Sequence, residues 1–598
     1  MNARARYEEW LSGNVIDEAT REELRKIEGD EKEIEDRFYE NLEFGTVGLR
    51  AAMGAGTNRM NRYTVRMATQ GLAYYLLKDQ ETVFGFADGS FDLKADDGVK
   101  NAKKVAIAYD SRYHSQEFAV EAAGVLVANG IEVYMFPWLH PTPMLSFAVR
   151  YLSCDAGINI TGSHNPKDDN GYKVYGPDGS PVVSPVDKEI MKEMHAIERL
   201  EACRFVPEEE LYGSTLFHII PDEVDDAFYT VVKRMVQNVI LSEVPYVPGA
   251  EEISIVYSPL HGTGLMPVTR ILKELGFTKV HVVDGQAIQD GDFSSVIRPT
   301  PEDPDAFKLA EEKAKRVGAD IIIITDPDAD RTGIRVLDKE SGEYVHFTGN
   351  MMGALLTEYV LSMRIRTRTM PENPAVVSSL VITDLVREIC KSYGVHCDAT
   401  GLIGFKYIMK TLRSYEEAGS YNYVFGLEDS NGFLPGDYVR DKDSVGTAAL
   451  LAAAAAYYHG QGMTLWDQMK KIYEKYGYYC EDLASKELVG KAGKLKIAEM
   501  IGTLREMPLK EIAGHKAISV TDYRRKAYTD MRTGEEKDAA VESSNMIYYR
   551  LEDGAWFLLR PSGTEPTIKL YAGAKGENAE DAARQVDKLM EAVKEVFG

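Results

Sequence analysis

A serine in a glycine-containing turn is the first residue whose setting suggests chemistry. The apolar segment AGINI is followed directly by TGSHNP, which makes Ser163 the third residue after the strand-like run. Gly162 gives the backbone freedom to turn. We therefore expect Ser163 to be presented at the carboxyl end of a strand, where open α/β sheets bind ligands. It is a candidate nucleophile, although a lone serine of this kind is more commonly an ordinary turn residue.

Three aspartates at alternate positions form a second candidate group. DIIIITDPDADRTG places Asp326, Asp328 and Asp330 directly after an apolar run. Carboxylate oxygens select hard cations, and three of them with room for a phosphate oxygen suit Mg²⁺. A solvated turn and a phosphorylated aspartate at Asp326 are alternatives. A calcium-binding EF-hand loop is a third, but it needs Gly and Glu where the chain has Arg331 and Leu337.

Two later loops carry groups suited to a sugar and a phosphate. GLEDSNG brings together Glu428 and Ser430, whose carboxylate and hydroxyl can hold adjacent sugar hydroxyls. RPSGTEP supplies a guanidinium, two hydroxyls and a glycine, at Arg560, Ser562, Gly563 and Thr564. Such a set forms a good phosphate cradle. Taken singly, a plain acidic surface loop and a hairpin turn are the more common explanations of these two segments.

In this order the motifs resemble those of the phosphohexomutases, the phosphoglucomutase and phosphomannomutase superfamily. TGSHNP followed by NGYK is similar to the phosphoserine loop of that family, and DPDADR is similar to its metal loop. GLEDSNG and RPSGTEP resemble its sugar-recognition and distal phosphate loops, and FGTVGLR resembles its amino-terminal segment. The resemblance spans essentially the whole chain. It is strongest to the longer, phosphoglucomutase-2-like branch.

The resemblance implies a role for each motif residue. Ser163 would carry the transferred phosphoryl group and would bind Mg²⁺ together with Asp326, Asp328 and Asp330. Lys173 would act as general acid and base, with a pKa lowered by neighbouring cations. Arg50 and His164 would complete the catalytic set. The substrate-binding residues would be Arg331, Glu428, Ser430, Lys442, Arg560, Ser562, Gly563 and Thr564.

The implied reaction is the interconversion of glucose 1-phosphate and glucose 6-phosphate by an α-phosphoglucomutase. It would pass through a phosphoserine enzyme and glucose 1,6-bisphosphate, which would also act as activator. Phosphopentomutase, phosphomannomutase and sugar-bisphosphate synthase activities are alternatives within the superfamily. Gly432 stands where the bacterial phosphomannomutase type has a histidine, which argues against mannose specificity. A non-catalytic sugar-phosphate sensor would not need a nucleophile, three acids and a phosphate loop together.

A pattern of strand, helix, strand, helix and strand occurs three times and must position these loops. Its copies begin at VAIAY, ISIVY and AVVSS and end at AGINI, DIIIIT and YNYVFG. The alternation predicts an α/β protein with three repeated mixed or parallel sheet domains, whose loops meet around a central cleft. The last segment predicts a smaller α+β domain. We expect the domains to span residues 1–212, 213–346, 347–484 and 485–598.

Composition excludes several classes of partner. A net charge of −25 argues against binding nucleic acid or an anionic membrane. A phosphate ester therefore needs local cations, and Arg50, Lys173 and Arg331 are the candidates. The sequence has neither a run long enough to span a bilayer nor a signal-peptide start, so we expect a cytoplasmic protein, monomeric or homodimeric. Its five scattered cysteines lack CxxC spacing, which predicts reduced thiols.

Overall fold

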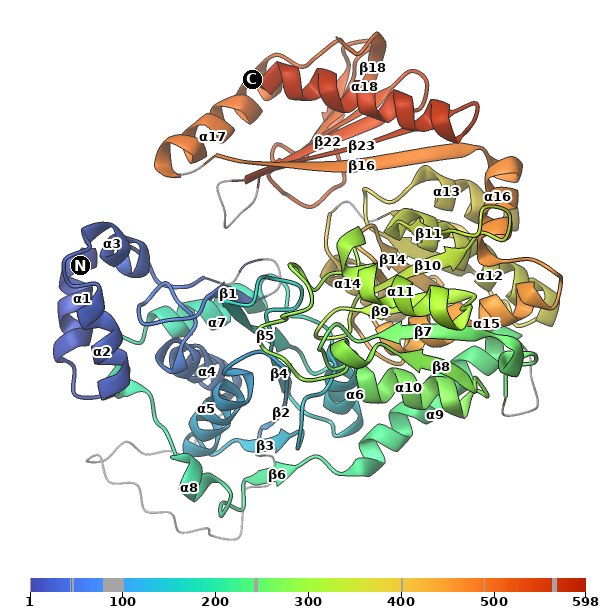
Figure 1. Cartoon of the computed structure of the whole chain (residues 1–598). Helices are drawn as coiled ribbons and strands as arrows, with labels where there is room; N and C mark the ends of the chain where they lie inside the picture. Colours follow the sequence, from blue (N-terminus) through green and yellow to red (C-terminus); the bar gives the residue numbers. More distant parts are fainter. Residues whose placement is uncertain are drawn as a thin grey trace.

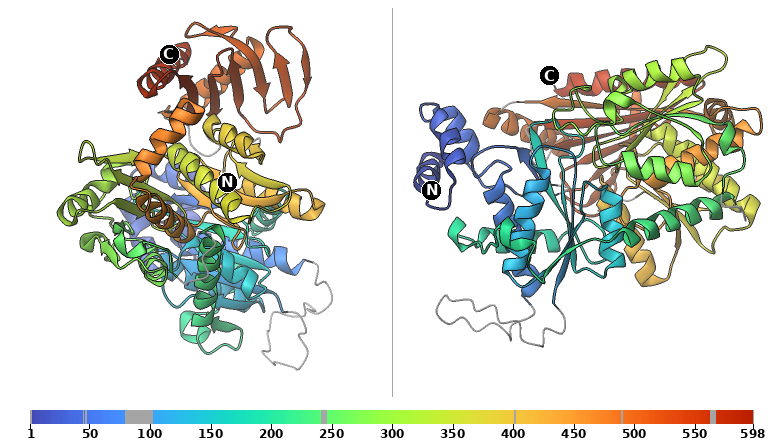
Figure 2. Two further views of the ribbon diagram at one scale, coloured as in Figure 1. Left: turned by 90° about the vertical axis from the view of Figure 1, so that its right-hand side faces the viewer. Right: turned by 60° about the horizontal axis from the view of Figure 1, so that its bottom comes forward.

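The computed structural model describes residues 2–43, 45, 48–78, 102–240, 246–399, 402–488, 490–561 and 567–597. These residues form four sheets, and Figure 1 shows them following one another along the chain, from blue to red. Figure 2 shows the fourth sheet and its helices as a lobe above the other three domains (left), with the N-terminal helices projecting at one end (right). The fold class predicted from the alternation is confirmed.

The first domain is built on a six-stranded sheet of order β1-β5-β4-β2-β3-β6. Its elements are α1 Ala3–Ser12, α2 Glu18–Lys26, α3 Glu31–Phe38, β1 Leu49–Ala52, α4 Arg62–Leu77, β2 Lys104–Tyr109, α5 Ser115–Ala128, β3 Glu132–Met135, α6 Thr142–Tyr151, β4 Ala156–Ile160, β5 Asp169–Tyr175, α7 Val186–His195, α8 Glu208–Leu211 and β6 Phe217–Ile219. Asp17 caps α2 by accepting from the Thr20 amide.

The second and third domains have five-stranded and four-stranded sheets. The second comprises α9 Asp222–Ile240, β7 Ser254–Ser258, α10 Leu265–Glu274, β8 Lys279–Val282, α11 Lys308–Val317, β9 Ile321–Thr325, β10 Thr332–Leu337 and β11 Tyr344–Phe347. The third comprises α12 Gly349–Thr367, β12 Pro374–Ser378, α13 Asp384–Tyr393, β13 His396–Ala399, α14 Phe405–Ala418, β14 Asn422–Glu428, β15 Gly432–Leu434, α15 Ser444–His459 and α16 Leu465–Tyr476.

These three domains share one topology. In each, three parallel strands lie in the spatial order third, first, second: β4-β2-β3, β9-β7-β8 and β14-β12-β13. An antiparallel strand then returns along the third one, as β5, β10 or β15. Strands β4 and β9 are buried along their whole length, as expected for strands covered by helices on both faces. The sheets are therefore mixed, and each motif loop is the connection of a hairpin.

The fourth domain is antiparallel, with a sheet of order β16-β23-β22-β21-β18-β19-β20 and β17 paired to β18. Its elements are β16 Tyr478–Glu487, α17 Gly490–Glu506, β17 Glu511–Ile512, β18 His515–Asp522, β19 Ala527–Asp530, β20 Glu536–Asp538, β21 Ile547–Leu551, β22 Trp556–Pro561, β23 Thr567–Gly576 and α18 Ala579–Phe597. Helix α18 packs on the sheet and places Val586, Leu589 and Val593 in its core. The expected α+β domain is thereby confirmed.

Two strands cross the expected domain boundaries. Strand β6 pairs with β3 in the first sheet, and β16 pairs with β23 along its whole length. We therefore propose that the first domain includes β6 and that the fourth begins at β16. The expected boundary at 346/347 falls at the last residue of β11.

One apolar core joins the first three domains. It runs from Phe147 in α6 through Phe228 in α9 to Ile472 in α16, and the Phe147 and Phe228 rings meet edge to face at 5.6 Å. The fourth domain has its own core. Across the ranges that the structure describes, no helix combines the length and apolarity needed to cross a bilayer.

Candidate active site

The hairpin loops of the first three domains meet at one place. The Ser163 hydroxyl of the β4–β5 loop donates to Asp326 Oδ2 at the start of the β9–β10 loop, at 3.1 Å. The second and third loops are joined by backbone pairing, since the Thr332 amide donates to the Asn431 carbonyl at 3.0 Å. The Ser444 amide donates to the Ala329 carbonyl at 3.2 Å. Three separate domains thus contribute to one site.

Ser163 has a conformation that the sequence did not reveal. Its own φ is 51°, so the left-handed residue of the turn is Ser163 itself. We had expected the unusual backbone conformation at Gly162. Gly162 is required for space, because a Cβ there would lie 2.7 Å from Arg112 Nε and 3.0 Å from the Asp169 carbonyl oxygen. The Ser163 amide donates to Thr161 Oγ1 at 2.7 Å. These constraints fix where the Ser163 hydroxyl points.

Arg112 organises this loop and was missed from the sequence. Its buried guanidinium donates to the carbonyl oxygens of Ser163, Asn165, Pro166 and Asp169, at 2.6, 2.6, 2.7 and 3.0 Å. The rigid fork of an arginine suits such a cluster of acceptors better than an ammonium group. The available signal was its position, because Asp110-Ser111-Arg112 directly follows β2 at the same sheet edge as Ser163.

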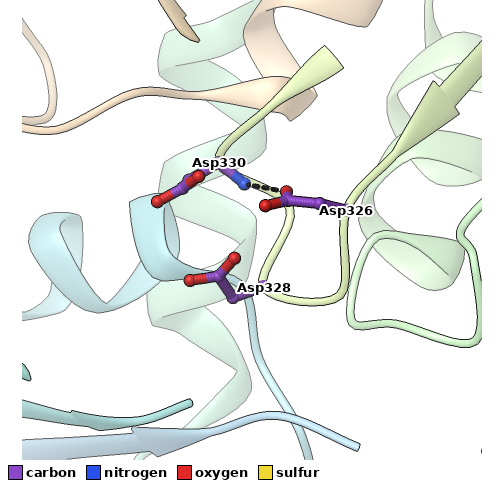
Figure 3. Close-up of side chains that lie close together, drawn as sticks. All are labelled: Asp326, Asp328 and Asp330. Carbon is purple, nitrogen blue, oxygen red and sulfur yellow. Dashed lines mark hydrogen bonds between the residues drawn. The ribbon is translucent and has the colours of Figure 1, made fainter. Parts of the chain in front are cut away.

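The three aspartates gather at the start of β10, and Figure 3 shows their side chains grouped around one loop. Asp326 Oδ1 accepts from the amides of Asp330 and Arg331, at 3.0 and 2.9 Å. Asp328 Oδ2 accepts from Lys173 at 2.6 Å and from Thr142 Oγ1, on the first domain, at 3.0 Å. All three carboxylates are buried.

The environments of these acids differ sharply. Burial, reinforced by Asp328 and Asp330, raises the pKa of Asp326 well above its ordinary value. Burial also acts to raise the pKa of Asp328, but Lys173 and Lys442 more than offset it and hold that pKa far below the usual range. Without a further cation, Asp326 is thus much harder to ionise than Asp328.

The loop offers oxygens that fit a divalent cation. One ligand oxygen from each aspartate lies within 4.8 Å of the others. Asp328 Oδ1 and Asp330 Oδ1 are buried and have no hydrogen-bond partner among the described residues. Buried acceptors left unpaired are costly, and a hard cation bound by oxygen ligands satisfies them. The residues present therefore fit Mg²⁺.

Buried cations surround the acids. Lys173 Nζ also lies 3.4 Å from Asp330 Oδ2, and Lys442 Nζ lies 3.2 Å from the same oxygen. Burial acts to lower the pKa of Lys173, but Asp328 and Asp330 outweigh it and raise that pKa above its ordinary value. The expected lowering was wrong, because its nearest neighbours are carboxylates and not cations. Lys173 is protonated in this arrangement.

Arg50 and His164 lie on either side of the Ser163 loop. Arg50 belongs to strand β1 rather than to a glycine-rich loop, since β1 pairs with β5, and its guanidinium donates to Asn165 Oδ1 at 2.7 Å. His164 Nδ1 lies 3.2 Å from Ser163 Oγ. Burial, together with Arg331 and Arg50, holds the pKa of His164 well below its ordinary value. The imidazole is therefore neutral.

Arg331 connects the acidic loop to its surroundings. It forms an ion pair with Glu302, and its Nε lies 4.0 Å from Asp330 Oδ1. Its backbone forms an antiparallel bridge with Gly432. Burial acts to lower the pKa of Arg331, but Glu302 and Asp330 outweigh burial and raise that pKa above its ordinary value. Arg331 therefore lies between the metal loop and the third loop as a permanent cation.

The third loop presents a buried carboxyl next to a hydroxyl. Burial raises the pKa of Glu428 above its ordinary value, and Ser430 is close enough to act in the opposite direction. Gly432 leaves room for this pair, because a Cβ there would lie 2.3 Å from Lys442 Cδ and 2.8 Å from Glu428 Oε1. A larger residue at position 432 would have to displace one of them. The structure thus brings Glu428, Ser430 and Lys442 together.

Arg560 lies at the end of β22, on the fourth domain. Its charge acts to lower the pKa values of Lys406 and Tyr407 of α14, and that of Tyr571. Asp429 and Glu428 act to raise the pKa of Tyr571. The remaining members of that motif, Ser562, Gly563 and Thr564, lie outside the described residues. Lys406 was not singled out from the sequence, and it adds a second cation beside Arg560.

Fold and site define a four-domain enzyme that gathers a serine, three acids and several cations at one junction. The family models of phosphoglucomutase/phosphomannomutase match in order: alpha/beta/alpha domain I over residues 41–201, domain II over 236–339, domain III over 348–476 and the C-terminal domain over 511–592. The phosphoglucomutase of Staphylococcus haemolyticus (strain JCSC1435) is 34% identical over 92% of this chain and 94% of its own. That of Staphylococcus aureus (strain N315) is 34% identical over 94% and 95%. The chain therefore belongs to the phosphoglucomutase/phosphomannomutase superfamily.

Solved structures support the same architecture. A putative phosphomannomutase from Thermus thermophilus superposes with a TM-score of 0.65 at 19% identity, covering 93% of this chain and 99% of that one. The open form of pp63/parafusin, a phosphoglucomutase from Paramecium, superposes with a TM-score of 0.64 at 16% identity, covering 93% and 94%. At these identities the likeness concerns the fold alone.

Proposed function

We propose that this protein is a phosphoglucomutase that interconverts glucose 1-phosphate and glucose 6-phosphate through a phosphoserine at Ser163. The observation that carries the proposal is the contact of Ser163 Oγ with Asp326 at 3.1 Å, inside a buried cluster of three acids and at least two lysines. The full-length relatives named phosphoglucomutase support glucose as the sugar. Glucose 1,6-bisphosphate is the proposed intermediate and activator.

In the first half-reaction the Ser163 phosphoryl group passes to the free hydroxyl of the sugar. Phosphoryl transfer depends mainly on positioning and on stabilising charge at the transferred group. Lys173, Arg50 and Arg331 supply positive charge from the first and second domains, and Arg112 holds the Ser163 loop in place. Mg²⁺ held by Asp326, Asp328 and Asp330 would neutralise further charge on the phosphoryl oxygens. Lys173, being protonated, acts here as a cation, and the proton that the sugar hydroxyl loses is balanced by the proton that the departing Ser163 oxygen takes up.

In the second half-reaction Ser163 receives a phosphoryl group and must lose its proton. Two groups lie within hydrogen-bonding distance of Ser163 Oγ, namely Asp326 Oδ2 at 3.1 Å and His164 Nδ1 at 3.2 Å, and we propose the neutral His164 as the acceptor of this proton. Glu428 and Ser430 would orient the sugar, and Arg560 would hold the phosphate that is not reacting. The intermediate must turn over between the halves, so that each of its phosphates faces Ser163 once.

The proposal is tested by following both the phosphoryl group and the sugar. Enzyme treated with glucose 1,6-bisphosphate and mapped by peptide mass spectrometry should carry one phosphoryl group on Ser163, stable to acid and to hydroxylamine. A phosphoryl group on Asp326, which hydroxylamine would remove, would overturn the assignment. Turnover of glucose, mannose, ribose and deoxyribose 1-phosphates with a trace of bisphosphate then identifies the sugar, and we expect glucose to give the highest kcat/KM.

A further inference from the structure

The third domain contains two neighbouring thiols that the mutase reaction does not use. Cys390 lies in the last turn of α13, and Cys397 lies in β13, the next strand along the chain. Both are free thiols. They belong to none of the loops that form the active site. Cys390 on α13 and Cys397 on β13 both pack against the shared apolar core.

The turn between them brings the two side chains to one side. Gly394 ends α13 with φ 67°, and the Val395 amide donates to the Cys390 carbonyl at 3.0 Å, so the chain folds back on the helix end. Side chains alternate along an extended segment. Cys397 therefore shares the inward side with buried Val395, whereas His396 between them is exposed. The two side chains are therefore close enough for each to shift the pKa of the other.

The two thiols are not equivalent. Cys390 is fully buried, whereas Cys397 is partly accessible. The proximity of Cys390, helped by the nearby Arg387, lowers the pKa of Cys397 against the opposing effect of burial, while the proximity of Cys397 and burial raise the pKa of Cys390. Asp398 and Asp384 oppose the effect on Cys397 only in part. An accessible thiolate beside a resolving thiol is the arrangement found in redox-active cysteine pairs.

We propose that Cys390 and Cys397 form a redox-active dithiol that a hydroperoxide oxidises to a disulfide within the third domain. The Cys397 thiolate attacks the O–O bond, so that an S–O bond forms and the alkoxide leaves and takes up a proton as alcohol. The Cys390 thiol then attacks the Cys397 sulfenic acid. The S–S bond forms, the S–O bond breaks, and hydroxide leaves with the Cys390 proton as water. The two electrons that reduce the hydroperoxide come from the two sulfurs.

The sequence offers a direct way to detect this bond. Lys391 is exposed between the two cysteines, so tryptic cleavage after Arg387, Lys391 and Lys406 separates Cys390 in peptide 388–391 from Cys397 in peptide 392–406. Full-length protein is treated with stoichiometric tert-butyl hydroperoxide, its free thiols are alkylated, and it is digested without reduction. We expect the two peptides to be joined, with loss of two hydrogen atoms, and to separate on treatment with dithiothreitol.

Variants assign the two roles. In Cys390→Ala the Cys397 sulfenic acid has no resolving partner and should be trapped by dimedone. In Cys397→Ser the buried Cys390 should react with peroxide and dimedone far more slowly than Cys397 does in Cys390→Ala. Cys203→Ser, which removes a cysteine of the first domain, should leave the linked peptides unchanged. Alkylation of both Cys390 and Cys397 in wild-type protein after peroxide treatment would overturn the proposal, and this readout needs no variant to fold. Faster dimedone labelling of Cys390 than of Cys397 would overturn the assigned order.

Discussion

At the scale of single residues, the most informative contrast is between Asp326 and Asp328. Both are buried in the same loop, yet the pKa of Asp326 is raised by burial and its acidic neighbours and that of Asp328 is lowered by Lys173 and Lys442. In the metal-free protein, a charge at position 326 therefore opposes folding. A charge at position 328 stabilises the fold through its ion pair with Lys173 at 2.6 Å.

This contrast predicts opposite effects of two matched substitutions on stability. Asp326→Asn should leave the Tm of metal-free protein unchanged or higher. Asp328→Asn leaves Lys173 without its nearest partner, and breaking a buried ion pair costs about 3–5 kcal/mol. Both should lower kcat by on the order of 10²-fold or more, because each removes a group at the transferred phosphoryl. Thermal melts in EDTA and turnover in Mg²⁺ measure the two effects. Equal loss of Tm in both variants would contradict the electrostatic account.

A second prediction concerns Arg112. Arg112→Lys keeps the charge but cannot reach all the carbonyl oxygens that the guanidinium binds, so the Ser163 loop should shift. A displacement of about 1 Å at a reacting group can cost on the order of 10²-fold in rate. We expect kcat and the rate of Ser163 phosphorylation by glucose 1,6-bisphosphate to fall together, with a smaller change in KM. The control is Arg66→Lys. Arg66 on α4 forms an ion pair with Glu121 on α5, and neither residue belongs to the Ser163 loop. A change in KM alone would show that Arg112 does not position Ser163.

The residues of the site were predictable where they follow a strand in a short motif. Ser163 and the three aspartates lie together because each motif ends a parallel strand at the same sheet edge. Arg112 was missed although it follows a strand at that edge, because its partners are backbone carbonyls that no motif reveals. Thr142 was not predictable, because its partner lies on another domain. The pKa of Lys173 was predicted in the wrong direction for the same reason, since its carboxylate neighbours come from the second domain.

At the scale of elements, the three repeats were predictable from alternating apolar runs, but the returning strands were not. Strand β5 has the sequence DNGYKVY, which begins with residues of low β propensity, and β15 has only three residues. These strands form because they pair with a buried neighbour, which is tertiary information. They matter for function, since they turn each motif into a hairpin that fixes Lys173 and Gly432 opposite the parallel strands.

Glu481 on β16 gives a prediction at this scale, because it joins β16 to the start of α13. Its side chain hydrogen-bonds Thr383, while Oε1 is buried without a partner among the described residues. Burial raises the pKa of Glu481 to about 8, from an ordinary 4.5. Because the pKa of Glu481 is higher in the folded than in the unfolded state, its contribution to stability is fully present below the ordinary pKa of 4.5. That contribution is lost as the pH rises through about 8.

Glu481→Gln should therefore melt at nearly the wild-type temperature near pH 5 and at a higher temperature near pH 9. Each unit of pKa shift corresponds to about 1.4 kcal/mol at most. Asp482→Asn, at the exposed neighbouring position, is the matched control and should not alter the pH profile. Parallel pH profiles for Glu481→Gln and wild type would show that the Glu481 carboxyl is not held protonated at this junction.

At the scale of the whole molecule, a chain of net charge −25 binds an anion by burying its cations together. Arg112, Lys173 and Lys442 are each less than a tenth exposed, and they come from two domains. Arg560 brings positive charge from the fourth domain toward Lys406. We therefore expect substrate capture to depend on the first, third and fourth domains each contributing positive charge to one small region.

Arg560→Ala tests the contribution of the fourth domain. The proposed contact of Arg560 with the non-reacting phosphate is made equally in the ground and transition states. Its loss should therefore raise KM more than it lowers kcat. Truncating a charged contact of this kind costs about 2–5 kcal/mol. The bisphosphate should also escape during its turn, so activity should require more added glucose 1,6-bisphosphate. The control is Arg532→Ala, at an exposed ion pair with Asp530 in the same domain. Unchanged KM and unchanged activator requirement would remove Arg560 from the binding site.

The apolar core that joins the first three domains has a consequence for biosynthesis. As the chain leaves the ribosome, Phe147 of α6 cannot pack against Phe228 until α9 has emerged, and the core is completed only by residues as late as Ile472. The earlier repeats therefore expose apolar surface while most of the chain is being translated, a condition that favours aggregation and chaperone binding. We expect nascent chains released between Asp330 and Ile472 to be bound by chaperones, although they already contain Ser163 and all three aspartates.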